Sequence, residues 1–117
     1  MIKLESLKKN SQFETVLKNR VINNELFSIY KAKNFIKNKS NLKKLYISFV
    51  MRKKVGNAVK RNRIKRRLKS TVQKLLKKNG AINSNYTYVI FGKERVFKEN
   101  NDFLFEKMEK SFRSIKG

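Results

Sequence analysis

Hydrophobic and polar positions alternate in two stretches of the chain, which is the pattern of a half-buried β-strand. In residues 25–33, Phe27 and Ile29 would point to one side of the strand, and Ser28 and Tyr30 to the other. In residues 45–52, the alternating sets are Leu45, Ile47, Phe49 and Met51, and Tyr46, Ser48, Val50 and Arg52. A polar run joins the two stretches, so we expect an antiparallel hairpin with a long loop.

A helical pattern comes before the first of these strands, over about residues 12–20. Ser11 and Glu14 have the spacing of a capping box, in which a hydroxyl and a carboxylate satisfy the free amides of a helix start. The apolar residues that share one face are Phe13, Val16 and Leu17. We therefore expect a short amphipathic helix that begins near Ser11.

A longer helix is predicted over residues 57–78, because the apolar residues there recur every three or four positions. Asn57 can cap its start, and Asn79 and Gly80 can end it. Its apolar stripe comprises Ile64, Leu68, Val72, Leu75 and Leu76. Residues 86–91 are β-branched and aromatic and predict a third strand, and residues 101–115 predict a closing helix.

The predicted order of elements, αββαβα, is that of an α+β two-layer sandwich, in which helices pack on one face of a small sheet. The first helix would leave part of the other face as a candidate groove. The chain has 117 residues, of which 39% are hydrophobic, so it has the length of one domain and enough apolar material for a core. We expect a single domain over residues 1–117.

The composition excludes several kinds of chemistry. The chain contains no Cys and no His, so it has no disulfide, no zinc finger, no thiol nucleophile and no imidazole base. No apolar run approaches the roughly 18 residues of a membrane span. The first ten residues lack the apolar core of a secretory signal. We therefore expect a cytoplasmic protein that does not enter a membrane.

The distribution of charge indicates a polyanionic partner. The net charge is +23, and all eight acidic residues lie toward the two ends, so there is no carboxylate from Leu26 to Lys93. A basic run usually forms a solvated face balanced by acids at helical spacing, and that balance is missing here. Self-repulsion of this size disfavours a compact chain, so the sequence predicts binding to a polyanion, most simply nucleic acid.

The start of the long helix concentrates this charge. On a helical wheel, the residues roughly opposite the apolar stripe are Asn62, Arg63, Arg66 and Lys69. Arg61 falls on the apolar side one turn before the stripe begins, so the helix start must project past the core and be exposed. Backbone amides at a helix start favour phosphate, and arginine forks suit bidentate phosphate contacts. Lysines surround the same end, namely Lys53, Lys54 and Lys60.

The order of these residues adds a family resemblance. The segment RKKVGNAVKRNRIKRRLK, residues 52–69, has Arg61-Asn62-Arg63 at its centre and resembles the signature segment of the protein subunit of bacterial ribonuclease P. We refer to residues 52–69 as the signature segment. The run LKKNSQFETVL resembles the first helix of that family, and LFSIY resembles its first strand. The resemblance covers roughly residues 4 to 95.

The resemblance implies a fold detail and a function. The family sheet is mixed and contains a left-handed βαβ crossover through the long helix. The family protein assists a catalytic RNA that removes the 5′ leader from precursor tRNA, and that RNA, with Mg²⁺, performs the hydrolysis. The protein is thus part of an endoribonuclease, its partners are the catalytic RNA and precursor tRNA, and it supplies no catalytic group. No residue of the chain is assigned as a metal ligand.

The resemblance also implies two sets of site residues. Those expected to contact the catalytic RNA are Lys53, Lys54, Asn57, Lys60, Arg61, Asn62, Arg63, Lys65, Arg66 and Arg67. Those expected to hold the leader, in a cleft between the first helix and the sheet, are Phe13, Leu17, Ser28, Tyr30, Arg52 and Lys93. Phe13 and Tyr30 could stack on bases, while Arg52 and Lys93 follow the backbone. Either aromatic residue could equally be an ordinary core residue.

Other functions are weighed against this one. A nuclease without RNA would need carboxylates clustered for metal ions or a general base, and only Glu94, Glu99 and Asp102 could gather in this way. A structural RNA-binding protein, such as a ribosomal one, fits the charge equally well, and the signature segment argues against it. A helix-turn-helix needs a short second helix after a tight turn, whereas a strand follows Gly80 here. A membrane-surface helix would be free-standing, whereas the apolar stripe from Ile64 to Leu76 has a sheet to cover.

Overall fold

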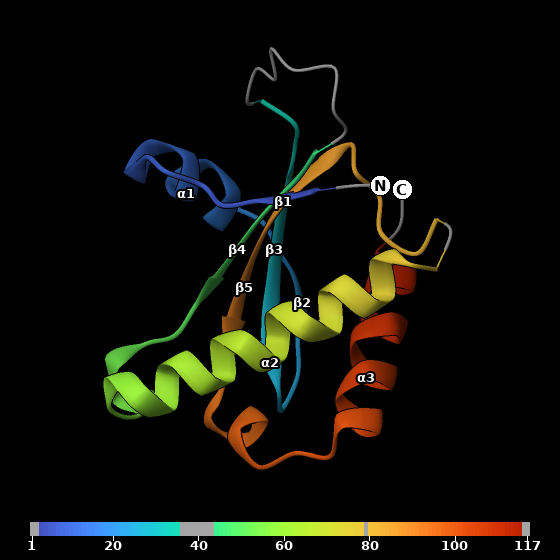
Figure 1. Cartoon of the computed structure of the whole chain (residues 1–117). Helices are drawn as coiled ribbons and strands as arrows, with labels where there is room; N and C mark the ends of the chain where they lie inside the picture. Colours follow the sequence, from blue (N-terminus) through green and yellow to red (C-terminus); the bar gives the residue numbers. More distant parts are fainter. Residues whose placement is uncertain (1–2, 36–43, 79, 116–117) are drawn as a thin grey trace.

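The computed structural model describes residues 3–35, 44–78 and 80–115 (Figure 1). The strands are β1 (Lys3–Glu5), β2 (Arg20–Asn23), β3 (Phe27–Lys33), β4 (Lys44–Val50) and β5 (Tyr86–Gly92). The helices are α1 (Asn10–Leu17), α2 (Ala58–Leu76) and α3 (Asn101–Ser114), with short 3-10 helices η1 (Lys53–Val55) and η2 (Glu94–Phe97). The predicted αββαβα order of an α+β fold is confirmed, and β1 and β2 are additional to it.

The five strands form one mixed sheet in the order β1-β4-β5-β3-β2. β5 runs antiparallel to β3, with Ile29 opposite Ile90, and parallel to β4, with Phe49 opposite Ile90. The predicted hairpin between β3 and β4 is therefore wrong, because β5 lies between them. The physical reason is that β5 is apolar on both faces, with Val89 and Ile90 both fully buried, and a strand buried on both faces belongs at the centre of a sheet.

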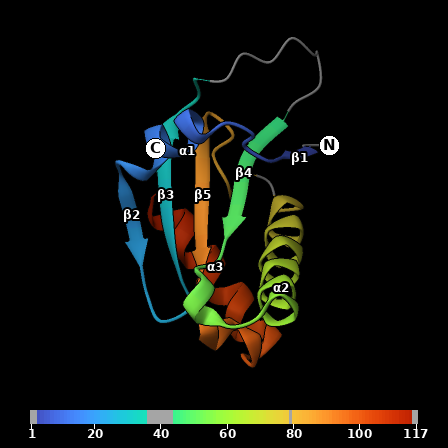
Figure 2. The same ribbon diagram turned by 90° about the vertical axis from the view of Figure 1, so that its left-hand side faces the viewer.

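The crossover from β4 through α2 to β5 is left-handed. Figure 2 looks at the face of the sheet that carries α1, with β4 and β5 running downward and β4 to the right of β5. α2 is drawn to the right of β4, and its apolar stripe packs in the main core, on the opposite face of the sheet from α1. With the helix turned toward the viewer and the strands pointing upward, β5 lies to the left of β4. About 98% of such connections are right-handed, so this detail departs from the general rule and agrees with the resemblance.

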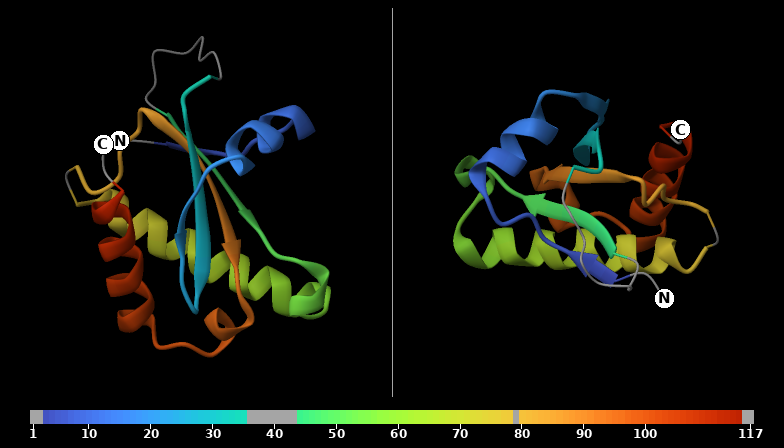
Figure 3. Two further views of the ribbon diagram at one scale, coloured as in Figure 1. Left: turned by 180° about the vertical axis from the view of Figure 1, so that it is seen from behind. Right: turned by 90° about the horizontal axis from the view of Figure 1, so that it is seen from above.

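The two faces of the sheet pack against different helices. α2 and α3 cover one face, and α1 lies over β3 and β5 on the other (Figures 1 and 3). The main core, between the sheet and α2 and α3, is built around side chains with almost no exposed surface, among them Phe27, Ile47, Ile64, Leu68, Ile90 and Phe112. A second, smaller cluster consists of Leu7, Val16, Tyr46 and Val89, with Phe13, Leu17, Tyr30, Ala32, Val50 and Phe91 packed against it. The predicted alternation of faces in β3 and β4 is thereby confirmed.

The start of α1 differs from the prediction. The helix begins at Asn10, and its N-cap is Lys9 rather than Ser11. The side-chain Oε1 of Gln12 accepts hydrogen bonds from the backbone N–H groups of Lys8 and Lys9, at 2.9 and 3.1 Å. The Gln12 side chain therefore satisfies the amides that the predicted capping box assigned to Glu14. Gln12 lies two residues before Glu14 in the chain. The helix also ends at Leu17, because Arg20 already belongs to β2.

Candidate nucleic-acid interface

The loop before α2 fixes the residue at which the helix begins. Asn57 is the N-cap, as predicted, and its Oδ1 accepts a hydrogen bond from the backbone N–H of Lys60 at 2.9 Å. Gly56 precedes it with a φ of 154°. This φ favours glycine, and a Cβ on Gly56 would lie 2.6 Å from Cδ of Lys60, so the lysine side chain would also have to move. The loop thus brings Lys60 close against the chain at the first turn of α2.

The apolar stripe of α2 determines which cations reach solvent. Ile64, Leu68, Val72 and Leu75 are fully buried, as predicted, so the opposite side of the helix faces outward. Seven of the ten residues expected to contact the catalytic RNA are exposed, namely Lys53, Lys54, Asn57, Asn62, Arg63, Lys65 and Arg66. The other three, Lys60, Arg61 and Arg67, are half-buried. The exposed seven and the half-buried three differ in what their polar groups contact.

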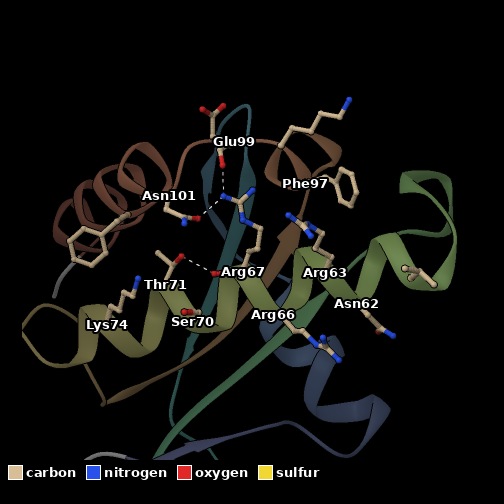
Figure 4. A pocket seen from close by; sticks show the side chains of 13 residues that line it. Asn62, Arg63, Arg66, Arg67, Ser70, Thr71, Lys74, Phe97, Glu99 and Asn101 are labelled. Carbon is tan, nitrogen blue, oxygen red and sulfur yellow. Dashed lines mark hydrogen bonds between the residues drawn. The ribbon is translucent and has the colours of Figure 1, made fainter.

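The guanidinium of Arg67 forms its hydrogen bonds within the protein. It donates hydrogen bonds to the backbone carbonyls of Val96 and Glu99, and to Oδ1 of Asn101 at 2.6 Å (Figure 4). Burial, followed by the neighbouring Arg63 charge, lowers the pKa of Arg67. The side chain therefore ties the segment from η2 to the start of α3 onto α2. Its contact with RNA stays a prediction.

Lys60 and Arg63 flank the ring of Phe97. The Lys60 Nζ and the Arg63 guanidinium carbon each lie 5.3 Å from the centroid of that ring. Lys60 Nζ also lies 2.7 Å from Oε1 of Glu94, and this hydrogen bond lowers the pKa of the Glu94 carboxyl. The first turn of α2 is thus joined to η2 by one ion pair and one shared aromatic ring.

Arg61 lies between the helix start and the core. It is half-buried, as expected for a residue on the apolar side one turn before the stripe. Its Nε is enclosed and has no hydrogen-bond partner within the described residues. Asn57, Ala58 and Val59 at the start of the helix are exposed, so the prediction that this end is exposed is confirmed.

Four of the six residues expected to hold the leader line one cleft. Ser28 and Tyr30 of β3, Arg52 after β4, and Lys93 after β5 surround a cavity of about 450 Å³. These residues come together because β5 lies between β3 and β4, so the ends of all three strands adjoin. We call this the sheet cleft. Its lining also includes residues that the resemblance does not assign to the leader, namely Arg20, Asn23, Lys54, Val55, Phe91, Gly92 and Glu94.

The wall of the sheet cleft is aromatic and its rim is cationic. Tyr30 and Phe91 meet edge to face, with ring centroids 5.6 Å apart, and the Arg52 guanidinium carbon lies 5.7 Å from the centroid of Phe91. Phe91 could have been found from its parity, because it shares a face with Val89 and not with the core residue Ile90. The cleft therefore offers ring surfaces beside a positive charge.

Asn23 organises the polar side of the sheet cleft. Its Oδ1 accepts a hydrogen bond from the Ser28 hydroxyl at 2.9 Å and another from Lys93 Nζ at 2.7 Å. Lys93 Nζ also donates to the backbone carbonyl of Asn24. The Lys93 ammonium is thus held at the edge of the cleft rather than extended into solvent. Asn23 lies on β2, a strand that periodicity did not reveal.

Phe13 and Leu17 are not among the residues that line the sheet cleft. Both are half-buried on α1 and, like Tyr30 and Phe91, pack against the second cluster. Their expected contact with a leader stays a prediction, and their packing under α1 accounts for the apolar face of that helix.

Comparisons with known proteins agree with this geometry. The family model described as Ribonuclease P matches residues 1–116. The ribonuclease P protein component of Mesomycoplasma hyopneumoniae (strain 7448) is 30% identical over 118 residues, which cover 99% of this chain and 96% of the relative. The same component of Fusobacterium nucleatum is 30% identical over 112 residues, covering 96% of this chain and 94% of the relative.

Solved structures show the same fold. The RNase P protein from Thermotoga maritima aligns with a TM-score of 0.74 and 20% identity, covering 97% of this chain and 99% of its own. That from Staphylococcus aureus aligns with a TM-score of 0.71 and 22% identity, covering 95% and 94%. The resemblance carried by the signature segment is confirmed over nearly the whole length. The chain belongs to the ribonuclease P protein family.

Proposed function

We propose that this chain is the protein component of a bacterial ribonuclease P, a single RNA-binding domain that binds the catalytic RNA and the 5′ leader of precursor tRNA. The observation that carries the proposal is the pairing of two adjoining cationic surfaces. One is the exposed side of α2, and the other is the sheet cleft, which shares Lys54 with the expected RNA-contact set. A polyanion that bound both surfaces would contact the segment of the chain that has no acidic residue on two of its sides.

The sheet cleft suits a single strand. Tyr30 offers a ring on which an unpaired base can stack, and Phe91 supports that ring from the side. Stacking of a base on an aromatic side chain contributes about 1–3 kcal/mol and tolerates any sequence. Arg20, Arg52 and Lys54 would then follow the phosphates at the rim. This chemistry would hold a leader without reading its bases, as a processor of many precursors requires.

The exposed side of α2 would bind the folded catalytic RNA. Its arginines present planar forks to phosphate oxygens, and the free amides at the start of α2 add partial positive charge. Asn62 and Arg63 lie on the outward side of the first two turns. In this proposal, the protein binds and orients both RNAs and lowers their mutual repulsion.

The chemistry of bond cleavage is assigned to the RNA partner. Within residues 3–35, 44–78 and 80–115, no three His, Cys, Asp or Glu side chains gather as ligands for a metal ion. The carboxylates therefore do not fit a metal centre in the described part of the protein. Mg²⁺ held by the RNA would activate the attacking water and stabilise the leaving oxygen.

The proposed work on tRNA precursors places the protein in the cytoplasm. As a separate finding, none of the helices in the described part of the chain is long and apolar enough to cross a bilayer.

The proposal is tested by cleavage of a precursor tRNA at low Mg²⁺. Three reactions are compared: a bacterial ribonuclease P RNA alone, the same RNA with this protein, and the protein alone. We expect fast cleavage only when both components are present, because the protein cations replace part of the charge screening that Mg²⁺ otherwise supplies. Tight RNA binding without stimulation would return the chain to the structural RNA-binding proteins. Cleavage by the protein alone would identify it as a nuclease.

Substitution of Tyr30 tests the assignment of the sheet cleft. Tyr30→Ala is expected to weaken binding of leader-bearing precursor tRNA by roughly 5- to 150-fold, which corresponds to about 1–3 kcal/mol for one lost stacking platform. Binding of mature tRNA should change little, because mature tRNA has no leader. The measurement is the dissociation constant of the reconstituted enzyme for the two tRNAs.

Two further variants make the Tyr30 result specific. Tyr30→Phe keeps the ring and should bind both tRNAs almost normally. Phe35→Ala removes another aromatic side chain, which is 40% exposed and does not line the sheet cleft, and should leave both constants unchanged. Equal losses for precursor and mature tRNA in Tyr30→Ala would remove the leader from this cleft.

A further inference from the structure

A second cleft shares Asn62, Arg63, Arg66 and Arg67 with the residues expected to contact the catalytic RNA. One wall is α2, and the other is η2 with the start of α3, as Figure 4 shows. We call it the α2–α3 cleft. Its volume is about 1130 Å³. Residues beyond the signature segment contribute to it, among them Ser70, Lys74 and Lys98, and the resemblance assigned no role to any of these three.

The charge of the α2–α3 cleft is strongly positive. Arg63, Arg66, Lys74 and Lys98 line it, and none of the four has a carboxylate within 4.0 Å in the part of the chain that the structure describes. The one acidic residue in the lining is Glu99. Since the cations are not compensated from within, the cleft is complementary to a polyanion.

The carboxylate of Glu99 is already engaged. Its Oε2 lies 3.2 Å from Nε of Arg95, and its Oε1 accepts a hydrogen bond from the backbone N–H of Asn100 at 3.1 Å. Arg67, which also lines the cleft, is equally engaged, because its guanidinium donates to the backbone carbonyls of Val96 and Glu99. Arg67 and Glu99 are thus paired within the protein, and the unpaired charge in the lining belongs to Arg63, Arg66, Lys74 and Lys98.

The α2–α3 cleft also has apolar surface between its cations. The ring of Phe97 is half-buried, and the unpaired Arg63 and the Glu94-paired Lys60 lie against it. Val59 on the first turn of α2 is 79% exposed. Aromatic surface beside unpaired cations is the combination that binds single-stranded nucleic acid, because a base stacks while its phosphates are neutralised. A duplex would offer no free base face to this ring.

The size of the cleft favours a polymer over a small anion. Pockets for single small molecules occupy roughly 300–1,000 Å³, and this open cleft exceeds that range. Its cations are also spread over three turns of α2, from Arg63 to Lys74, and across to Lys98 on the opposite wall. One isolated phosphate could not contact all of them.

We propose that the α2–α3 cleft binds a short single-stranded segment of RNA, with phosphates on Arg66, Lys74 and Lys98 and a base against Phe97. This inference rests on the proposed function and extends it, because it carries the RNA contact from the signature segment into the C-terminal half of α2 and onto η2 and α3. The strand can come from the catalytic RNA or from the precursor, and its chemistry is the same in both.

The test compares two double variants that remove the same charge. Lys74→Gln with Lys98→Gln removes two cations from the α2–α3 cleft, and Lys33→Gln with Lys110→Gln removes two exposed cations that do not line it. Binding to ribonuclease P RNA alone, to precursor tRNA alone and to an oligouridine is measured at several salt concentrations. Each phosphate contact on a single strand contributes about 0.7 to the slope of log K against log salt.

We expect the cleft variant to lose about 1.4 from that slope with oligouridine, while the control keeps the wild-type slope. A loss with ribonuclease P RNA, and none with precursor tRNA, would assign the strand to the catalytic RNA. The opposite pattern would assign it to the precursor. Wild-type slopes for the cleft variant with all three RNAs would overturn the proposal.

The aromatic part is tested by Phe97→Leu, which keeps apolar volume and removes the ring. Affinity for oligouridine should fall by about 5-fold at constant salt slope. An unchanged affinity, in a variant that melts like the wild type, would remove the base from the proposal. If the wild-type chain fails to stimulate cleavage and the cleft variant still loses slope with oligouridine, the proposed function falls and the cleft assignment stands.

Discussion

Replacing Arg67 by methionine is expected to lower the free energy of unfolding by about 3 kcal/mol. Methionine replaces the part of the side chain from Cβ to Nε and has no donor, so the carbonyls of Val96 and Glu99 and the Asn101 side chain lose their shared partner. A hydrogen bond to a charged group contributes about 1.5–3 kcal/mol, and a buried acceptor left without a donor adds its own cost. Urea denaturation followed by circular dichroism measures the change.

The neighbouring residue Arg66 provides the matched control. Arg66 is exposed on the same helix, and its guanidinium forms no ion pair and no hydrogen bond with the described residues. Arg66→Met should leave the free energy of unfolding within about 0.5 kcal/mol of the wild-type value. It should instead weaken RNA binding. Similar stability losses in the two variants would show that the Arg67 contacts contribute nothing beyond those of any surface arginine.

Comparing Arg66 with Arg67 also separates an RNA contact from a structural role. Both belong to the ten residues that the resemblance assigns to RNA contact, yet they lie one position apart and differ in exposure. A loss of RNA binding in Arg67→Met alone would not identify a contact, because the variant also loosens the wall of the α2–α3 cleft. Only a change in salt slope, at equal folding, separates a phosphate contact from a positioning role.

Replacing Gly92 by valine is expected to cost about 3 kcal/mol, at the upper end of the cost of overpacking a core. A Cβ at this position would lie 2.8 Å from Cγ2 of Ile64, 2.8 Å from Cδ1 of Leu68 and 3.0 Å from Sδ of Met51. Two of these residues belong to the fully buried stripe of α2, so the helix must move away from the end of β5. Thermal or urea unfolding measures the loss.

A double variant separates steric overlap from other effects of losing glycine. Leu68→Ala alone should cost about 2–5 kcal/mol, because it leaves a cavity in the main core. Combined with Gly92→Val, the loss should be smaller than the sum of the two single losses, since the valine fills part of that cavity. Strict additivity would mean that the space beside Leu68 is not what requires glycine.

Periodicity predicted the elements of the main core well. The stripe from Ile64 to Leu75 and the alternation in β3 and β4 each arise from one repeated period, and burial follows that period directly. Strands β1 and β2 were not predicted because their sequences show no such period. β1 has three residues and exists by pairing with Lys44–Tyr46 of β4, and β2 has four residues with a break in its register between Arg20 and Ile22.

Strand pairing could not be obtained from local pattern. The loop between β3 and β4 is compatible with a hairpin, and nothing within either strand shows that β5 will insert between them. The preference arises only when the whole sheet is compared, because Val89 and Ile90 can both be buried only in a central strand. The left-handed crossover was likewise obtained from family resemblance, against the general rule.

The candidate site was predicted as a set of residues rather than as a shape. Charge and the signature segment located the exposed side of α2, and the resemblance named four residues of the sheet cleft. Neither indicated that Arg67 turns inward, because that depends on carbonyls some 30 positions later, at Val96 and Glu99. The α2–α3 cleft was missed for the same reason, since one of its walls comes from η2 and α3.

The position of β5 has a consequence for how the protein is made. β5 lies at the centre of the sheet, yet it is the last strand to leave the ribosome. Until Gly92 has been synthesised, β3 and β4 have no common neighbour, and α2 has no completed sheet to cover. We therefore expect the main core to form late in synthesis, in one step that joins distant segments, while the chain before that step is a largely unfolded polycation. RNA already present at that moment would neutralise the charge that opposes this closure.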